Sequence, residues 1–329
     1  MRPTECSRLR GSLRSARWAC LISLLTITDL AQQARSADHN VTVPTAAPAS
    51  DSLPQITVRA RRHAIEEQVH RFVNDILYLE NDEGPARWSS PVCPTVAGLA
   101  REEGEFVLQR LSQVGRTAGV PLADEKCSAP NLFVIASAHP VEVLTRWAKK
   151  THGAIFGGAT PTAVRAVIDT SQPVLAWYNA DQVDADGGPR AVDLPDGLGT
   201  VNAMVGLQAP ALRNPRGASH LTRSVRWSLC SVILVIDKTQ LNGVTHGQLA
   251  DYISMHAFAR LKTGARPGDV PTILGLFAGA AAESPPGLTT WDAAFLESLY
   301  HTDAVVMQQR MLMVTRMVEH IVPDPSSPQ

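Results

Sequence analysis

The sequence predicts an α/β protein, with a mixed sheet of about four or more strands packed by amphipathic helices and a helical C-terminal part. Short apolar runs bounded by turn residues alternate with segments of helical period, which is the pattern of strands and helices packed in layers. A strand, a helix and a strand follow one another within residues 92–137, and such a unit is usually parallel and right-handed. The apolar content of 44% is sufficient for a substantial buried core.

Residues 1–37 have the composition of a cleavable secretory signal peptide. Five arginines and one glutamate occupy residues 1–17, and an apolar run follows at 18–28. This run of eleven residues is too short to cross a bilayer, which takes about 20. Small side chains precede the two expected cleavage positions, after Ser36 and after Ala37. We therefore expect an exported protein, periplasmic or secreted; the alternative is a cytoplasmic N-terminus or a misplaced start codon.

Cleavage would change the charge of the protein and, with it, the partners that we expect. The leader contains six arginines and two acidic residues, so its removal takes the net charge from −1 to −5. A mildly acidic chain without a basic block lacks the electrostatic surface that nucleic acids and anionic membranes attract. We expect no nucleic-acid partner, no integral membrane segment in the mature chain and no cofactor, and a protein or peptide as the possible partner.

The composition predicts a single globular domain at residues 61–322. A flexible lead-in is expected at 38–60, where the chain is small, polar and contains proline, and a disordered tail at 323–329. The stretch 180–226 is rich in Gly, Asp, Pro and Asn and is a possible sub-boundary. A connection of this length is uncommon in a compact domain unless it is a functional loop or contains a hairpin.

The periods of the apolar residues define the elements of the first half of the domain. Six apolar residues between Ile65 and Leu77 fall on one face at helical spacing, which predicts an amphipathic helix over 63–80. Pro140 lies where a helix can begin, because N–H groups in the first turn lack a helical acceptor in any case. The remaining predictions, in chain order, are a strand at 92–99, a helix at 101–118, a strand at 131–137, a helix from Pro140, a short helix at 162–170 and a strand at 173–179.

The second half begins with the clearest buried strand, at 229–237, and continues into helices. The first of these begins near His246, after a short loop. Thr289 and Asp292 have the spacing of a capping box, which predicts that a helix opens there. The last helix carries four methionines, which we interpret as core filler, because the flexible thioether chain fills irregular gaps.

Three cysteines would remain in the mature chain. An oxidising compartment permits two of them to pair. Cys93 and Cys127 lie in polar contexts beside predicted strands, so we predict a disulfide between them; the alternative is three reduced thiols. Cys230 lies inside the apolar run LCSVILVI, which predicts a buried thiol.

The sequence contains no complete catalytic motif, and whether the protein is an enzyme is left open. No G-x-S-x-G elbow, H-E-x-x-H helix, C-x-x-C pair or EF-hand loop occurs, and no residue is assigned a catalytic or metal-binding role. The glycine cluster at 152–160 lacks the lysine of a phosphate-binding loop and is interpreted as a turn. The possible cleft residues, which border the later helix or the irregular stretch, are His246, Asp251, His256, Trp177 and Trp227, with Tyr178 beside Trp177.

Four segments follow one another from Val232 onward: the strand VILVID, the helix GQLADYISMHAFARL, the segment PTILGLF and the phrase LTTWDAAFLESLY. In this order they resemble a family of exported bacterial proteins of unassigned activity, whose core is similar to a degenerate zincin. In a working zincin the helix holds two His ligands and a Glu that activates the metal-bound water. The closest register places Ala250, Asp251 and Ser254 at those positions. The resemblance therefore implies a peptidase-like scaffold without a zinc site.

Two functions of different classes follow from these observations. The first is a non-catalytic binding or assembly protein on this scaffold, which meets a protein or peptide through residues 180–226 and the end of the strand that begins at Val232. The alternative is a hydrolase with unconventional catalytic residues, drawn from His152, His220, His246, Asp251 and His256. These side chains would have to converge on one cleft.

Overall fold

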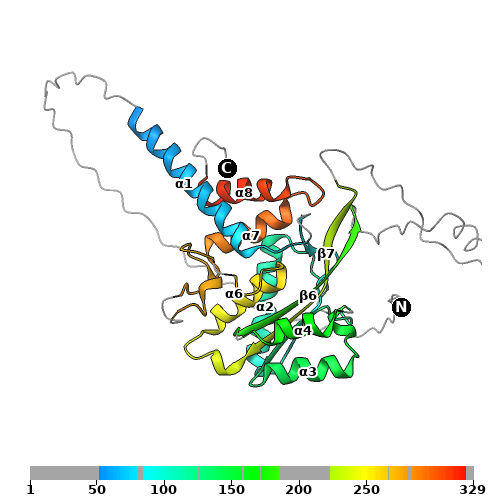
Figure 1. Cartoon of the computed structure of the whole chain (residues 1–329). Helices are drawn as coiled ribbons and strands as arrows, with labels where there is room; N and C mark the ends of the chain where they lie inside the picture. The colour runs from blue at the N-terminus through cyan, green and yellow to red at the C-terminus, as the bar shows by residue number, and fades with distance from the viewer. Residues whose placement is uncertain are drawn as a thin grey trace, which may run out of the picture. The chain divides into compact units, whose positions relative to one another are not determined.

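Figure 1 shows the computed structural model of the chain, which describes residues 52–80, 84–124, 126–157, 159–170, 172–185, 223–265, 267–279 and 284–323. These residues belong to one compact unit, Asp51–Gln329. The predicted signal peptide with its cleavage positions, most of the predicted lead-in, most of the stretch 180–226 and the tail from 324 lie outside the described residues.

The centre of this unit is a five-stranded mixed sheet, which confirms the predicted α/β class. Its strands are β3 (Arg87–Trp88), β4 (Pro94–Ala97), β5 (Leu132–Ser137), β6 (Val174–Asp184) and β7 (Val225–Asp237). The long β7 is central: one of its edges pairs in parallel with β5 and β3, and the other pairs antiparallel with β6. Because β4 pairs in parallel with β5, the predicted parallel unit within 92–137 is confirmed.

Alternate side chains of the strands enter separate cores on the two faces of the sheet. In β7, Val232, Leu234 and Ile236 face the larger core. Ile233 and Val235 face the smaller core, and all five side chains are fully buried. Because both faces are covered, this strand is a continuous apolar run instead of an alternating one.

Helices cover both faces of the sheet (Figure 1). Those of the larger core are α1 (Ser52–Ile76), α2 (Arg101–Ala118), α6 (His246–Phe258), α7 (Thr290–His301) and α8 (Gln309–Ile321). Those of the smaller core are α3 (Pro140–Lys150), the 3-10 turn η1 (Ala154–Phe156) and α4 (Pro161–Ile168). The short elements are the antiparallel pair β1 (Leu79–Glu80) and β2 (Gly84–Pro85) and the 3-10 turns η2 (Lys238–Gln240) and η3 (Ile273–Gly275). Of the described helices, none is long and apolar enough to cross a membrane.

The first helix begins at Ser52, inside the stretch that we predicted as a flexible lead-in. Pro54 lies in its first turn, where a missing N–H removes no helical hydrogen bond. Among the side chains of this helix that the structure describes, from residue 61 onward, the fully buried ones lie between Val69 and Ile76. The apolar period therefore indicated only the later part of a longer helix.

Two paired strands extend into the irregular stretch 180–226 from its two ends and form a hairpin. Strand β6 continues to Asp184 and β7 begins at Val225, and these two residues pair with each other. Beyond them, the backbone N–H of Ala185 donates to the carbonyl oxygen of Ser224 at 3.1 Å. The end of β6 and the start of β7 were missed because polar and charged residues interrupt the apolar run there. A hairpin is one of the two explanations that the length of this stretch allowed.

The predicted cysteine pair is present. Cys93 and Cys127 lie at disulfide distance, with their Cα atoms 5.9 Å apart. Two hydrogen bonds to Asn131 fix the same region. The side-chain oxygen of Asn131 accepts the backbone N–H of Cys93 at 2.7 Å, and the backbone N–H of Asn131 donates to the Cys93 carbonyl oxygen at 3.1 Å. The pair joins the chain just before β4 to the segment that leads into β5.

Cys230 is exposed, so the prediction of a buried thiol is wrong. The pairing of β6 with β7 steps from Asn179–Ser231 to Ala180–Leu229. Cys230 is therefore the extra residue of a β-bulge, which turns its side chain out of the regular alternation. Partial burial nevertheless raises the pKa of its thiol.

The four methionines of the last helical segment divide between the core and the surface. Met313 and Met317 are fully buried, as the core-filler interpretation predicted, whereas Met307 and Met311 are 49% and 55% exposed. In α8, Met313 and Met317 are four residues apart and share a face, whereas Met311 is two residues from Met313 and lies on nearly the opposite face; Met307 lies in the turn before α8. The interpretation is therefore confirmed for one half of the set and wrong for the other.

Candidate functional site

The three possible cleft residues on α6 do not converge. His246, Asp251 and His256 are five residues apart, and each such step turns about 140° around a helix of 3.6 residues per turn. Each of the three side chains accordingly has different neighbours. Of the other residues considered for a hydrolase, His152 lies in the turn after α3, and His220 lies outside the described residues.

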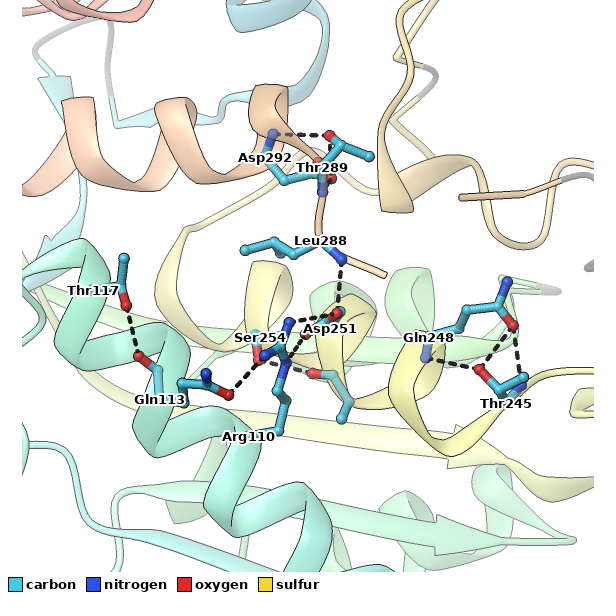
Figure 2. Close-up of polar contacts among 11 residues, drawn as sticks. Arg110, Gln113, Thr117, Thr245, Gln248, Asp251, Ser254, Leu288, Thr289 and Asp292 are labelled. Atoms are coloured by element: carbon cyan, nitrogen blue, oxygen red, sulfur yellow. Dashed lines mark hydrogen bonds and ion pairs between the residues drawn. The ribbon is translucent and has the colours of Figure 1, made fainter. Parts of the chain in front are cut away.

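Asp251 is buried in an ion pair, at the centre of Figure 2. Its carboxylate accepts Nε of Arg110 at 2.5 Å and a second guanidinium nitrogen at 3.0 Å. It also accepts the backbone N–H of Leu288 at 2.7 Å. The Asp251 side chain is only 3% exposed, and a Cβ atom at Gly287 would lie 2.7 Å from its oxygen. Asp251 therefore holds α2, α6 and the segment before α7 together.

The positions that the zincin-like register assigns lie in the filled core. Ala250 is fully buried, and the hydroxyl of Ser254 donates to the Ala250 carbonyl oxygen at 2.8 Å. Within the described part of the chain, no three His, Cys, Asp or Glu side chains are grouped to hold a metal ion. The zincin-like resemblance stays a prediction.

A second buried carboxylate, Asp292, belongs to the capping box that the sequence predicted, which is confirmed. It accepts the N–H groups of Ile273 and Thr289, each at 2.9 Å, and the hydroxyl of Thr272. Burial raises the pKa of Asp292, and these hydrogen bonds act against the rise. Its role is to join η3 to the start of α7.

Trp177 and Tyr178 define a groove along the outer edge of β6. They are consecutive strand residues, so their side chains point to opposite faces of the sheet. Trp177 packs edge-on against Phe156 in the smaller core, with ring centroids 5.0 Å apart, while Tyr178 packs against the larger core. Both nevertheless line one groove of about 440 Å³. A groove that both faces share must run along the edge of the strand.

An amide fixes the orientation of Trp177. The side-chain oxygen of Asn179 accepts the Trp177 indole N–H at 2.9 Å. Its NH₂ group donates to the Ile155 carbonyl at 2.8 Å and to the Ser231 hydroxyl at 2.7 Å. A Cβ atom at Gly157 would lie 2.7 Å from the Asn179 oxygen, so the glycine of the predicted turn allows this approach.

The walls of the groove are aromatic and basic. Arg260 lies over the ring of Tyr78, 4.2 Å from its centroid, in a cation–π contact. The ammonium of Lys262 donates to the backbone carbonyl of Asn74 at 2.5 Å. Among the described side chains that line the groove are these two cations, and none of them is a carboxylate.

A small inner pocket of about 40 Å³ adjoins the groove, and the two share residues including Ala176, Tyr178 and Leu261. His256 lies here, with Nδ1 3.2 Å from the Tyr178 hydroxyl and its ring 4.7 Å from that of Tyr252. Burial lowers the pKa of His256 to about 4 and raises the pKa of both tyrosines. At neutral pH the pocket therefore presents an uncharged imidazole and two phenols.

The outer edge of β6 has no strand partner among the described residues, because β7 occupies the inner edge. On such an edge, every second residue directs its backbone N–H and C=O away from the sheet. These groups can pair with an added extended chain. The groove beside them is large enough to admit one.

Two predicted cleft residues line adjoining hollows at this edge, Trp177 in the groove and His256 in the inner pocket, and the other three lie elsewhere. Trp227 is half-buried in β7 opposite Gln182, outside the groove lining. His246 lies beside Glu103, with Nε2 3.2 Å from a carboxylate oxygen. Sequence reasoning missed other groove residues, Tyr78, Arg260 and Lys262, because no local pattern brings these segments to β6.

In comparisons with known proteins, no family model, curated protein or solved structure matches the chain. A proposal about function therefore rests on the geometry of this edge.

Proposed function

We propose that this protein is an exported, non-catalytic binding protein that takes up an extended peptide along the outer edge of β6. The observation that carries the proposal is the groove that Trp177 and Tyr178 share beside this edge. Addition of a peptide strand to a free sheet edge is a general recognition mode, in which backbone hydrogen bonds supply affinity and flanking pockets select alternate side chains.

The chemistry of the groove suggests which peptide would bind. Lys262 supplies a positive charge, and none of the described residues that line the groove carries a carboxylate, so the groove favours an acidic side chain or a free C-terminal carboxylate. Trp177 and Tyr78 offer aromatic surface for an apolar neighbour. The inner pocket beside His256 is small enough to admit only a short polar group.

The surroundings of α6 support a binding role over hydrolysis. Nearly all of its residues from Gln248 to Phe258 are buried, so the helix is packed on most sides. The residues considered for a hydrolase, His246, Asp251 and His256, contact different partners. This arrangement offers the hydrolase alternative no support.

The proposal is tested by selecting peptides from a random library on the purified protein. We expect selected sequences to be enriched in Asp or Glu, or to require a free C-terminus, and to bind Lys262→Glu at least tenfold more weakly. The matched control is Lys150→Glu, because Lys150 is an exposed lysine at the end of α3. A library that yields no binder, or peptides whose affinity Lys262→Glu and Lys150→Glu alter equally, would contradict the proposal.

A further inference from the structure

A second hollow, separate from the β6 groove, opens at one end of the sheet. It has a volume of about 220 Å³ and shares no lining residue with the groove or its inner pocket. Five aliphatic side chains line it: Leu99, Val107, Leu241, Val244 and Leu249.

The hollow lies beyond the carboxyl ends of parallel strands. Leu99 comes two residues after β4, and Lys238 directly follows β7. These strands and β5 between them run in the same direction. In open α/β sheets, ligands generally bind in a crevice at this end of the strands. The position is therefore one where a small-molecule site is expected.

The floor of the hollow is apolar and its size is that of a small molecule. Val107 and Leu249 are 2% and 5% exposed, and the other three aliphatic side chains are half-buried. An apolar cavity of about 150 Å³ holds benzene, so a hollow of this volume has room for about eight carbon atoms.

One cation at the rim is available to an anionic head group. The ammonium of Lys238 donates to the carbonyl of Gly98 at 3.1 Å, which uses one of its three protons. Glu103 and His246 also line the hollow. The carboxylate of Glu103 is already engaged, since His246 lies 3.2 Å away and the backbone N–H of Ala100 donates to it at 3.1 Å. An apolar floor below a lysine favours a molecule with a hydrocarbon chain and one negative end.

We propose that this hollow binds a small aliphatic carboxylate of about eight carbons, with the chain on Val107 and Leu249 and the carboxylate at Lys238. The proposal does not depend on the peptide groove. Burial of each methylene should then raise the affinity about fourfold until the hollow is filled.

The experiment is a calorimetric titration of the purified protein with butanoate, hexanoate, octanoate and decanoate, and with octylamine and octanol as controls for the charge. We expect the affinity to rise through the series to octanoate, and octylamine to bind far more weakly. Lys238→Gln should weaken octanoate about tenfold. Lys149→Gln, at an exposed position in α3, is the matched control and should leave octanoate unchanged.

A second variant tests the position independently of the charge. Val244 is a half-buried residue of the lining, and Val244→Phe should fill the hollow and abolish octanoate binding. In the parent protein, octanoate should shift the methyl NMR signals of the aliphatic lining residues only. The proposal is overturned if the affinity does not depend on chain length, if octylamine binds as well as octanoate, or if Lys238→Gln and Lys149→Gln behave alike. If Val244→Phe fails to fold, the chain-length series and the Lys238→Gln variant still test the proposal.

Discussion

Asp251 joins α6 to α2 through a buried ion pair with Arg110. Its carboxylate balances the positive charge of the Arg110 guanidinium and accepts the backbone N–H of Leu288, and the Asp251 side chain is only 3% exposed. The bond to Asp251 is also the main cause that raises the pKa of Arg110. Removal of one partner of such a pair costs more than the pair contributes, because the other partner keeps its desolvation penalty.

We therefore expect Asp251→Asn to lower the free energy of unfolding by about 2–3 kcal/mol, measured by urea denaturation. Arg110 remains 30% exposed, which places the loss below that of a fully buried pair. Glu105→Gln is the matched control, because it breaks the exposed pair with Arg101 and should change stability little. Equal losses in the two variants would show that Asp251 has no special role.

His256 makes stability depend on pH. Burial lowers its pKa to about 4 from an ordinary value of 6.5, so between these values the unfolded chain binds the proton and the folded protein does not. The contribution of His256 is therefore complete above pH 6.5 and is lost as the pH falls toward 4. A shift of this size corresponds to about 3 kcal/mol.

The check is a comparison of the wild type with His256→Gln, by urea denaturation at pH 7 and pH 4.5. We expect the wild type to lose about 2 kcal/mol more than the variant over this interval. If both proteins lose the same amount, His256 is not held neutral by its surroundings.

Local spacing reveals some residue contacts and not others. Thr289 and Asp292 are three residues apart, so the capping box could be predicted from sequence alone. Arg110 and Asp251 are 141 residues apart, and no local pattern indicates their contact. Asp251 could therefore be proposed as a cleft residue, although its carboxylate is fully used in packing.

At the scale of elements, the Cys93–Cys127 pair fixes the entry to the parallel strands. The two residues are 34 positions apart, and closing a loop of that length stabilises the fold by about 3–4 kcal/mol in the chain-entropy model. We expect the double variant Cys93→Ser/Cys127→Ser to lose that amount of unfolding free energy, measured by urea denaturation. Cys230→Ser should lose little, because its side chain is exposed. Three titratable thiols under oxidising conditions in a chain that begins at residue 38 would contradict the pairing.

Strand β6 shows how far periodicity defines an element. Its apolar start, from Val174 to Tyr178, predicted a strand at the correct place. The end of β6, where polar residues interrupt the apolar run, and the bulge at Cys230 of β7 could not be predicted, because both depend on how the two strands pair. The edge position of β6 likewise follows only from the order of the strands, and that position creates the groove.

At the scale of the whole molecule, apolar periods were sufficient to predict the α/β class and most elements. They do not encode which faces meet, so the order of the strands and the two hollows could not be inferred. The helix α6 illustrates the difference: its existence follows from sequence, but its burial on most sides requires the helices of the larger core to surround it.

The central claim is that a peptide adds to the outer edge of β6, and hydrogen exchange of the protein with a selected peptide tests it most directly. The account predicts slower exchange at alternate amides within Val174–Asp184, the ones that face away from β7, with the β7 amides unchanged. Unchanged exchange throughout β6, or protection confined to another part of the chain, would contradict it.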